Sequence, residues 1–288
     1  MSVMRDYTTS LKPIVRWVGG KRDLARMLSD IAYASLQRTG GHYHEPFLGG
    51  GAVAFDLGLP EMVLSDLCAP LIDTYRAIQR WPRDVAWMLD VYRNRGCDAD
   101  VYYRVRDEAP TSRVERAARF LYLNTLCYNG VYRENASGKY NVPYGRRAGG
   151  ATPNFLSVDD LIAFQKLTVT ASFAATDFRE SLAAVGAGDF VYADPPYYAV
   201  FDKYQKGGFS DGDHLDLATA LRDTYDRGAE ILTTNADVPC VRELYDWAFV
   251  VPTVENRRVS QTKAGRAKAA CLLITTVPDL LPPSFGAQ

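Results

Sequence analysis

The sequence predicts an α/β fold built on a mostly parallel β-sheet that helices cover on both faces. Two stretches, from about Leu11 to Tyr75 and from about Leu167 to Leu273, alternate short apolar runs with glycine-containing turns and helical segments. Strands that alternate with helices favour parallel pairing in one sheet. The stretch between them, from about Ala77 to Asp160, is rich in Arg, Tyr and Asn, and we interpret it as an insertion.

Short apolar and β-branched runs give the candidate strands, and longer segments with one apolar face give the candidate helices. The predicted strands are Val63–Asp66, Leu167–Thr170, Phe190–Ala193, Ala229–Thr234 and Ala269–Ile274. The predicted helices are Leu161–Gln165, Leu215–Arg227 and Val238–Tyr245, with Val85–Arg95 and Arg113–Cys127 in the insertion.

Composition limits the class of protein without choosing its function. The 288 residues are 47% hydrophobic and 23% charged, which is typical of a globular chain. The net charge is −1, so any contact with nucleic acid must come from a local patch. The five cysteines form no Cys-x-x-Cys pair, which favours reduced thiols and predicts no metal site. Without a signal core or a membrane-length apolar run, we expect a cytoplasmic protein with no membrane contact.

The most informative motif is Asp194-Pro195-Pro196-Tyr197, which directly follows the predicted strand Phe190–Ala193. An exocyclic amino group on a nucleobase is a poor nucleophile, because its lone pair is delocalised into the ring. Asp194 and the Pro195 carbonyl can each accept one N–H of such a group, and Tyr197 can stack on the ring. With S-adenosylmethionine as methyl donor, this chemistry needs no metal or strong base. The alternative interpretation is a strand that simply ends at prolines.

Two glycine clusters lie in the first part of the chain, and one of them has the shape of a nucleotide-binding turn. The first is Glu45–Gly51, and Asp66 ends the next predicted strand, where a carboxylate can bind a ribose diol. NAD binding or a plain tight turn would share this pattern, and Asp66 can also cap a helix over Ala69–Ile78. The second cluster, Arg16–Lys21, places Trp17 and Lys21 beside two glycines, which suits a cofactor with a sulfonium and a carboxylate.

Taken together, these motifs resemble the Dam-type (alpha-group, D12 class) N6-adenine-specific DNA methyltransferases. The resemblance runs from about Leu11 to Ile274 and follows the order of the family. Its pieces are Arg16–Lys21, Glu45–Gly51, Leu64–Asp66, Thr176–Phe178 and Asp194–Tyr197.

The resemblance implies a Rossmann-like S-adenosylmethionine-dependent methyltransferase sheet with an antiparallel last strand, plus a smaller helical target-recognition domain with a β-hairpin. The catalytic domain would comprise residues 1–76 and 166–288, and the recognition domain residues 77–165. Asp194, Pro195, Pro196 and Tyr197 would be catalytic and would hold a flipped adenine. The implied cofactor-binding residues are Trp17, Gly20, Lys21, Glu45, Phe47, Gly49, Gly51, Asp66, Asp177, Phe178 and Asp194.

The insertion resembles the recognition domain of this family in detail. We expect a helix that runs into a polar loop and a hairpin, with its turn at Asn135–Gly138. Arg133 is expected to read guanine in the major groove, and Tyr128 with Asn129 to wedge into the duplex. In relatives with this pattern the preferred target is GATC. The expected DNA-binding residues are Tyr128, Asn129, Val131, Arg133, Lys139, Asn141, Pro143 and Arg146.

Two departures from the family pattern concern the substrate more than the chemistry. The residues after Tyr197 lack the usual Ser/Thr-containing stretch, and Asn235-Ala236-Asp237 lies where relatives commonly show Ser-Asn-His. We expect double-stranded DNA as the partner and no obligate protein partner. Adenine in another DNA context or in RNA stays an alternative, as does a non-catalytic DNA-binding protein. Protein-glutamine methylation is disfavoured, because those enzymes begin the motif with Asn.

Overall fold

The computed structural model describes residues 10–21, 23–145, 153–198, 208–256 and 268–283. The chain divides into two units. The first unit comprises Met1–Arg22, Gly49–Pro60 and Cys68–Ala175, and the second comprises Asp23–Leu48, Glu61–Leu67 and Thr176–Gln288. Each unit therefore collects pieces that are far apart in the sequence.

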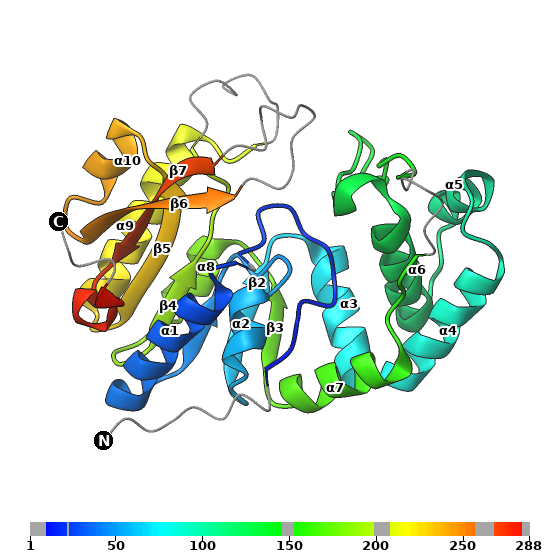
Figure 1. The fold of residues 1–288 in the computed structure, drawn as a ribbon, viewed down its shortest axis with the longest axis horizontal. Helices are drawn as coiled ribbons and strands as arrows, with labels where there is room; N and C mark the ends of the chain where they lie inside the picture. Colours follow the sequence, from blue (N-terminus) through cyan, green and yellow to red (C-terminus); the bar gives the residue numbers. More distant parts are fainter. Residues whose placement is uncertain (1–9, 22, 146–152, 199–207, 257–267, 284–288) are drawn as a thin grey trace. The chain divides into compact units, whose positions relative to one another are not determined.

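Within the described residues, seven strands form one sheet in the order β3-β2-β1-β4-β5-β7-β6 (Figure 1). β1 is parallel to β2 and β4, β4 is parallel to β5, and β7 is antiparallel to both β5 and β6. The predicted α/β class, a mostly parallel sheet with an antiparallel last strand, is confirmed. The strands are β1 Tyr43–Glu45, β2 Met62–Asp66, β3 Ser172–Ala175, β4 Phe190–Ala193, β5 Glu230–Ala236, β6 Phe249–Asn256 and β7 Lys268–Thr275.

β4 illustrates why the sequence of a central strand in this sheet is an unbroken run of apolar residues. All four of its residues are buried. Val191 and Ala193 join an apolar cluster with Leu182 of helix α8 (Phe178–Ala183), Leu217 of helix α9 (Asp211–Asp226) and Ile231 of β5. Because side chains alternate along a strand, the two other residues of β4 point to the opposite face of the sheet. Burial on both faces is typical of a parallel strand that helices cover.

The helices of the second unit begin and end at recognisable capping residues. α9 starts with a capping box, in which Ser210 and Asp213 satisfy each other's backbone N–H groups. α1 ends at Gly40, whose φ of 74° is left-handed. The helices of this unit are α1 Ala25–Thr39, α8 Phe178–Ala183, α9 Asp211–Asp226, α10 Pro239–Leu244 and the short 3₁₀ helix η5 Pro278–Leu280.

In the first unit, α3, α4, α6 and α7 pack against one another around buried aromatic rings. Tyr75 stacks on Phe164 with ring centroids 5.5 Å apart, and Tyr92 packs on Tyr122 at 5.8 Å. The helices of this unit are α2 Ala52–Leu57, α3 Ala69–Arg80, α4 Pro82–Asn94, α5 Ala99–Asp107, α6 Arg113–Leu126, the 3₁₀ helix η2 Tyr128–Gly130 and α7 Val158–Thr168.

Two sequence-based expectations are wrong, and the strand β6 was missed. The predicted strand Leu167–Thr170 is wrong, because α7 continues through Thr168 from a capping box at Ser157, and the strand follows only at Ser172. The strand β6 was not predicted, because Pro252 interrupts its apolar run; at the edge of a sheet, proline is tolerated. Asp66 does not cap α3, whose N-cap is Cys68.

No helix among the described residues has the length and apolar character needed to cross a membrane.

Candidate active site

Carboxylates follow the ends of four neighbouring strands of the sheet. Glu45 ends β1, Asp66 ends β2, Asp194 follows β4, and Asp177 lies two residues after β3. The strand order β3-β2-β1-β4 therefore places them in the sequence Asp177, Asp66, Glu45, Asp194 along one edge.

Two backbone hydrogen bonds show that the segments after these strands lie beside one another. The Thr176 N–H donates to the Asp66 carbonyl at 3.2 Å, and the Leu48 N–H donates to the Ser65 carbonyl at 2.9 Å. The carboxyl ends of parallel strands are where open α/β sheets bind their ligands. This edge of the sheet is therefore the candidate active site.

β5 supports the Asp194 motif from the neighbouring strand position. The Thr234 hydroxyl donates to Asp194 Oδ1 at 2.7 Å, and Asn235 Oδ1 accepts the Tyr198 N–H at 2.9 Å. Both β5 side chains are buried. β5 thus fixes the motif at both ends. Thr234 binds the side chain of Asp194, and Asn235 binds the backbone at Tyr198, directly after Tyr197.

Within the motif, exposure differs from one residue to the next. Pro195 is buried, Pro196 is exposed, and Tyr197 is half-buried. The Tyr198 ring packs against His214 of α9, with centroids 5.1 Å apart. The predicted atypical loop beyond it, up to Tyr204, lies outside the described residues.

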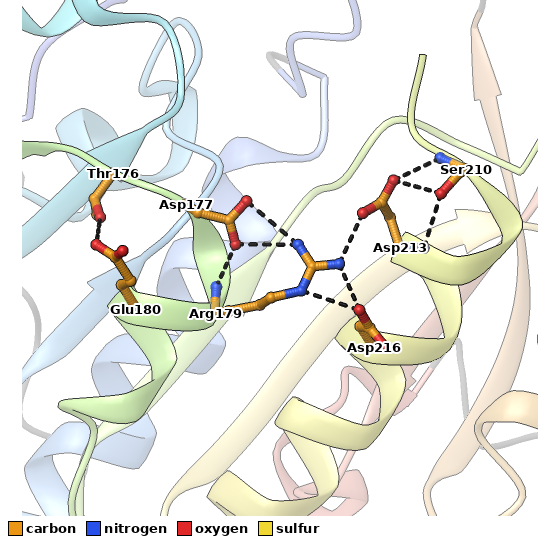
Figure 2. Close-up of polar contacts among 7 residues, drawn as sticks. All are labelled: Thr176, Asp177, Arg179, Glu180, Ser210, Asp213 and Asp216. Atoms are coloured by element: carbon orange, nitrogen blue, oxygen red, sulfur yellow. Dashed lines mark hydrogen bonds and ion pairs between the residues drawn. The ribbon is translucent and has the colours of Figure 1, made fainter. Parts of the chain in front are cut away.

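At the β3 end of this edge, Asp177 caps α8 and takes part in a network of ion pairs (Figure 2). Its Oδ1 accepts the Arg179 N–H at 2.9 Å and an Arg179 Nη1–H at 3.2 Å. The Arg179 guanidinium also donates to Asp213 at 2.7 Å and to Asp216 at 2.6 Å, both on α9. Hydrogen bonds from Ser210 and Arg179 lower the pKa of the Asp213 carboxyl to about 2.

Three aromatic rings lie next to this network. Phe47, which follows β1, stacks on Phe178 with centroids 5.5 Å apart, and Phe209 contacts both rings at 5.8 and 5.7 Å. Phe178 is 4% exposed. Its ring is therefore a buried support beneath the site, and its contact with a ligand would have to come from the ring edge or the backbone.

In the first unit, the glycine turn at Gly49–Gly51 has the backbone that only glycine adopts easily. Gly49 and Gly51 have φ values of 47° and 64°, and Gly51 starts α2. A Cβ added at Gly49 would lie 2.6 Å from Trp17 Cδ1. The turn therefore admits the Trp17 ring at van der Waals distance.

The segment around Trp17 is anchored by α6. The Asn124 side chain accepts the Arg16 N–H at 2.9 Å and donates to the Arg16 carbonyl at 2.9 Å. Trp17 also stacks on Tyr132, with centroids 5.9 Å apart. Lys21 is buried and its Nζ donates to the Gly19 carbonyl at 3.2 Å; the neighbouring Gly20 is exposed.

The residues after α6 form a hairpin-like loop. Single antiparallel bridges join Cys127 to Tyr144 and Glu134 to Tyr140, and the Gly138 N–H donates to the Asn135 carbonyl at 2.9 Å across the turn. At its base, the Tyr128 N–H donates to the Pro143 carbonyl at 3.0 Å.

Several predicted DNA-binding side chains of this loop are exposed. Tyr128 is 44% exposed, and Asn129 has a φ of 55°, the one positive value outside glycine among the described residues. Arg133 is exposed, and its Nε donates to Asn141 Oδ1 at 2.7 Å. Lys139 and Pro143 are exposed and Val131 is half-buried, whereas Arg146 lies outside the described residues.

His44 is accounted for by packing at the start of the sheet, whereas the His42 side chain is exposed. His44 is buried and its Nε2 lies 3.2 Å from Asp189 Oδ2, while the His42 N–H donates to Asp189 Oδ1 at 2.8 Å. Burial lowers the pKa of His44. Among the described residues, no group of three or more His, Cys, Asp or Glu side chains could hold a metal ion.

Sequence reasoning did not identify the side chains that hold the site residues in place. Thr234 and Asn235 come from the strand beside β4, and Arg179 with its partners Asp213 and Asp216 joins two helices. The Thr-Thr-Asn run at the end of a predicted strand was the one available signal for the first two. The Arg179 partners lie 34 and 37 residues away, so no local pattern marks them.

Comparison with known proteins gives one family over most of the chain. The family model described as D12 class N6 adenine-specific DNA methyltransferase matches residues 17–259. The type II methyltransferase M.MjaIII of Methanocaldococcus jannaschii is 31% identical over 280 residues, which cover 90% of this chain and 96% of the relative. M1.LlaDCHI of Lactococcus lactis subsp. cremoris, also a type II methyltransferase, is 29% identical over 287 residues, 96% of this chain and 99% of its own.

A third relative, the DNA adenine methylase of Serratia marcescens, is 30% identical over 271 residues, which cover 91% of this chain and 97% of the relative. Among solved structures, the rRNA methyltransferase aviRa from Streptomyces viridochromogenes covers 89% of this chain and 86% of its own, with 16% identity and a TM-score of 0.36. This structural likeness is too low to bear on function.

Proposed function

The chain belongs to the D12 class N6 adenine-specific DNA methyltransferases, and from this premise we propose that it methylates N6 of an adenine flipped out of duplex DNA, in the sequence GATC. The proposed methyl donor is S-adenosylmethionine. The family establishes an adenine-specific DNA methyltransferase. The donor, the flipped base and the sequence GATC are what the proposal adds.

The observation that carries the proposal is the row of carboxylates at the carboxyl edge of the sheet. Asp194, at one end of the row, would lie next to the methionine part of the cofactor and the target amine. Asp66 ends β2, from where a carboxylate can accept both hydroxyls of a ribose. A row of acceptors fits a ligand with an ammonium group, a ribose diol and an adenine amine.

The other proposed cofactor contacts suit the rest of the same molecule. Glu45 and Phe47 are proposed to contact it, as are Gly49 and Gly51 of the glycine turn and Trp17, Gly20 and Lys21 of the segment Arg16–Lys21, because these motifs resemble those of the family. Bound S-adenosylmethionine supplies a methyl group on a positively charged sulfur, which makes the transfer favourable without a metal.

The protein's own part in the transfer is to hold and orient the amine. Asp194 and the Pro195 carbonyl would accept the two N–H bonds of N6, which directs the nitrogen lone pair out of the ring plane. Pro196 fixes the backbone beyond them, and Tyr197 would stack on the flipped base. As the new N–C bond formed, the bond between the methyl group and the donor's sulfur would break and leave a neutral thioether, and the nitrogen would lose one proton, for which Asp194 is the nearest proposed acceptor.

Residues 77–165 are proposed as the target-recognition domain. Tyr128 and Asn129 would fill the gap left by the flipped base, because both are exposed in the short 3₁₀ helix η2 that follows α6. Arg133, whose Nε and Nη2 both donate to Asn141, would offer its remaining N–H groups to guanine. Lys139 and Arg146 would contact phosphates, and Val131 and Pro143 would lie against bases.

The test is to express the chain in a host that lacks adenine methylation and to map modified bases in its DNA. We expect N6-methyladenine in GATC. Asp194→Ala should lower methyl transfer by a factor of about 10²–10³ or more, because it removes an acceptor that orients the reacting amine. Binding of the duplex, measured by fluorescence anisotropy, should be largely preserved.

The matched control is Asp246→Ala, at an exposed aspartate just before β6. It should methylate at the normal rate. Normal turnover by the Asp194→Ala enzyme would remove Asp194 from the catalytic role. Methylation confined to another DNA sequence would refute GATC, and transfer of labelled methyl groups to RNA or protein, with none to DNA, would refute the proposed substrate.

A further inference from the structure

Arg179 joins the starts of two helices that flank the candidate site. Its Nη1 contacts both carboxylate oxygens of Asp177 at 3.2 and 3.3 Å, so it grips the residue that caps α8. Its Nη2 and Nε donate to Asp213 and Asp216 in the first turns of α9 (Figure 2). All three nitrogens of the guanidinium are therefore used, each toward a carboxylate.

The same guanidinium lies over an aromatic ring. Arg179 Cζ is 4.3 Å from the centre of the Phe178 ring. Phe178 packs in turn on Phe47 and Phe209. The conformation of Arg179 thus fixes both the carboxylate of Asp177 and the outer face of the ring that follows it.

Isolated ion pairs on a protein surface contribute little to stability, and the Arg179 side chain is 39% exposed. The Arg179 network differs from an isolated ion pair, because three carboxylates bind one planar guanidinium and together fix its orientation. Asp213 is itself immobilised by its bonds to the Ser210 hydroxyl at 2.6 Å and N–H at 2.9 Å. At α9 the network is therefore fixed by hydrogen bonds within the protein, and at its other end Asp177 faces the proposed ligand.

The order of strands indicates which part of the cofactor lies nearest Asp177. Asp194, Asp66 and Asp177 follow β4, β2 and β3, so Asp177 is at the far end of the row from the reacting amine. The cofactor has its methyl group toward one end, its ribose in the middle and its adenine at the other end. If Asp194 lies at the methyl group and Asp66 at the ribose, Asp177 is the carboxylate that lies nearest the adenine amino group.

We propose that Arg179 is a positioning residue for cofactor recognition: held by Asp213 and Asp216, it orients the Asp177 carboxylate to accept an N–H from the cofactor's adenine amino group. This inference rests on the proposed function, since it requires S-adenosylmethionine at the candidate site. Lysine cannot replace the fork, because a single ammonium cannot bind three carboxylates in fixed directions.

The experiment measures the dissociation constants of S-adenosylhomocysteine and S-inosylhomocysteine by calorimetry. The inosyl analogue carries a carbonyl where adenosine has its amino group, so its position 6 can no longer donate to Asp177. The wild-type protein should bind S-adenosylhomocysteine about tenfold or more tightly than the inosyl analogue, as expected for a hydrogen bond to a charged acceptor. In Arg179→Gln this preference should fall to within about threefold, mainly through weaker binding of S-adenosylhomocysteine.

Arg38→Gln is the matched control. Arg38 also bridges two carboxylates, Glu230 at 2.6 Å and Asp279 at 2.8 Å, and its side chain is 45% exposed, but it lies on α1. Its loss should leave the preference between the two analogues unchanged. Arg179→Lys keeps the charge and should show a preference between that of the wild type and that of Arg179→Gln. This second variant keeps the test valid if Arg179→Gln does not fold.

The outcomes separate the two levels of the proposal. An unchanged preference in both Arg179 variants, even with a lower melting temperature, would overturn the positioning role and leave Arg179 as a structural ion pair. A wild-type protein that binds neither analogue would instead refute the proposed cofactor, and the role of Arg179 with it. A preference that falls equally in Arg38→Gln would also refute the role, because the effect would then be nonspecific.

Discussion

Asp194 accepts a neutral hydrogen bond from the adjacent strand, and this bond can be removed with little change of shape. Thr234→Val keeps the branched side chain in β5 but deletes the hydroxyl that donates to Asp194 Oδ1 at 2.7 Å. Hydrogen bonds to charged groups contribute about 1.5–3 kcal/mol. We therefore expect kcat to fall by about 10- to 100-fold in steady-state methylation assays, with Kd for DNA unchanged.

Thr275→Val provides the control, since Thr275 is equally buried in the same sheet and donates to the Ile231 carbonyl at 2.9 Å, away from Asp194. It should lower the melting temperature without a comparable loss of kcat. Thr234→Ser should retain most activity, because it keeps the hydroxyl. If Thr234→Val lost only as much activity as Thr275→Val, Thr234 would have no orienting role.

Among the elements, the segment from Arg16 to Lys21 is unusual because it carries three proposed cofactor residues but is neither helix nor strand. Its anchor is Asn124 of α6, which binds the N–H and the carbonyl of Arg16 at 2.9 Å each. Asn124→Leu removes the hydrogen-bond partners of both Arg16 backbone groups. Each of these groups that stays buried should lower the free energy of unfolding by roughly 1–3 kcal/mol. We expect a lower melting temperature and a Kd for S-adenosylhomocysteine raised severalfold.

Asn124→Asp separates the two hydrogen bonds. Aspartate can still accept the Arg16 N–H but cannot donate to its carbonyl, so both effects should be intermediate. A destabilised Asn124→Leu protein with an unchanged Kd would show that the Arg16 segment does not contribute to cofactor binding.

The elements also show how far the sequence could predict this fold. β4 was predicted with the bounds that the structure has, because a buried parallel strand is a short apolar run that ends abruptly, here at Asp194 and Pro195. The β-branched run at Thr168–Thr170 misled the same reasoning. Helix α7 extends through Thr168 because Leu161, Phe164 and Leu167 are buried at helical spacing.

For the site, the sequence could predict the groups that face the ligands but not those that hold them. Carboxylates at strand ends and glycines at turns are marked by their neighbours in the chain. Arg179 and Thr234 matter through contacts that depend on which strands and helices are adjacent in space. That adjacency comes from the strand order, which no local pattern contains.

The net charge of the whole molecule limits the ways in which it can bind DNA. With 33 Lys and Arg against 34 Asp and Glu, the chain has a net charge of −1 and offers no general attraction to a polyanion. Affinity must then come from a few cations at the contact surface, and sequence preference from groups that reach base edges. Binding strength and sequence choice should therefore be separable by single substitutions.

Arg133 and Lys139 allow that separation, because both are exposed in the hairpin-like loop after α6. Lys139→Ala should weaken GATC and non-cognate duplexes equally, and should reduce the slope of log K against log salt by about 0.9, as for the loss of one phosphate contact. Arg133→Ala should cost about 1–3 kcal/mol of discrimination at one base pair, because the fork that Asn141 holds in place is lost. Salt titrations of binding on cognate and single-mismatch duplexes measure both quantities. If the two variants behaved alike, either both residues would contact only phosphates or neither would contact DNA, and Arg133 would leave the set of proposed base-reading residues.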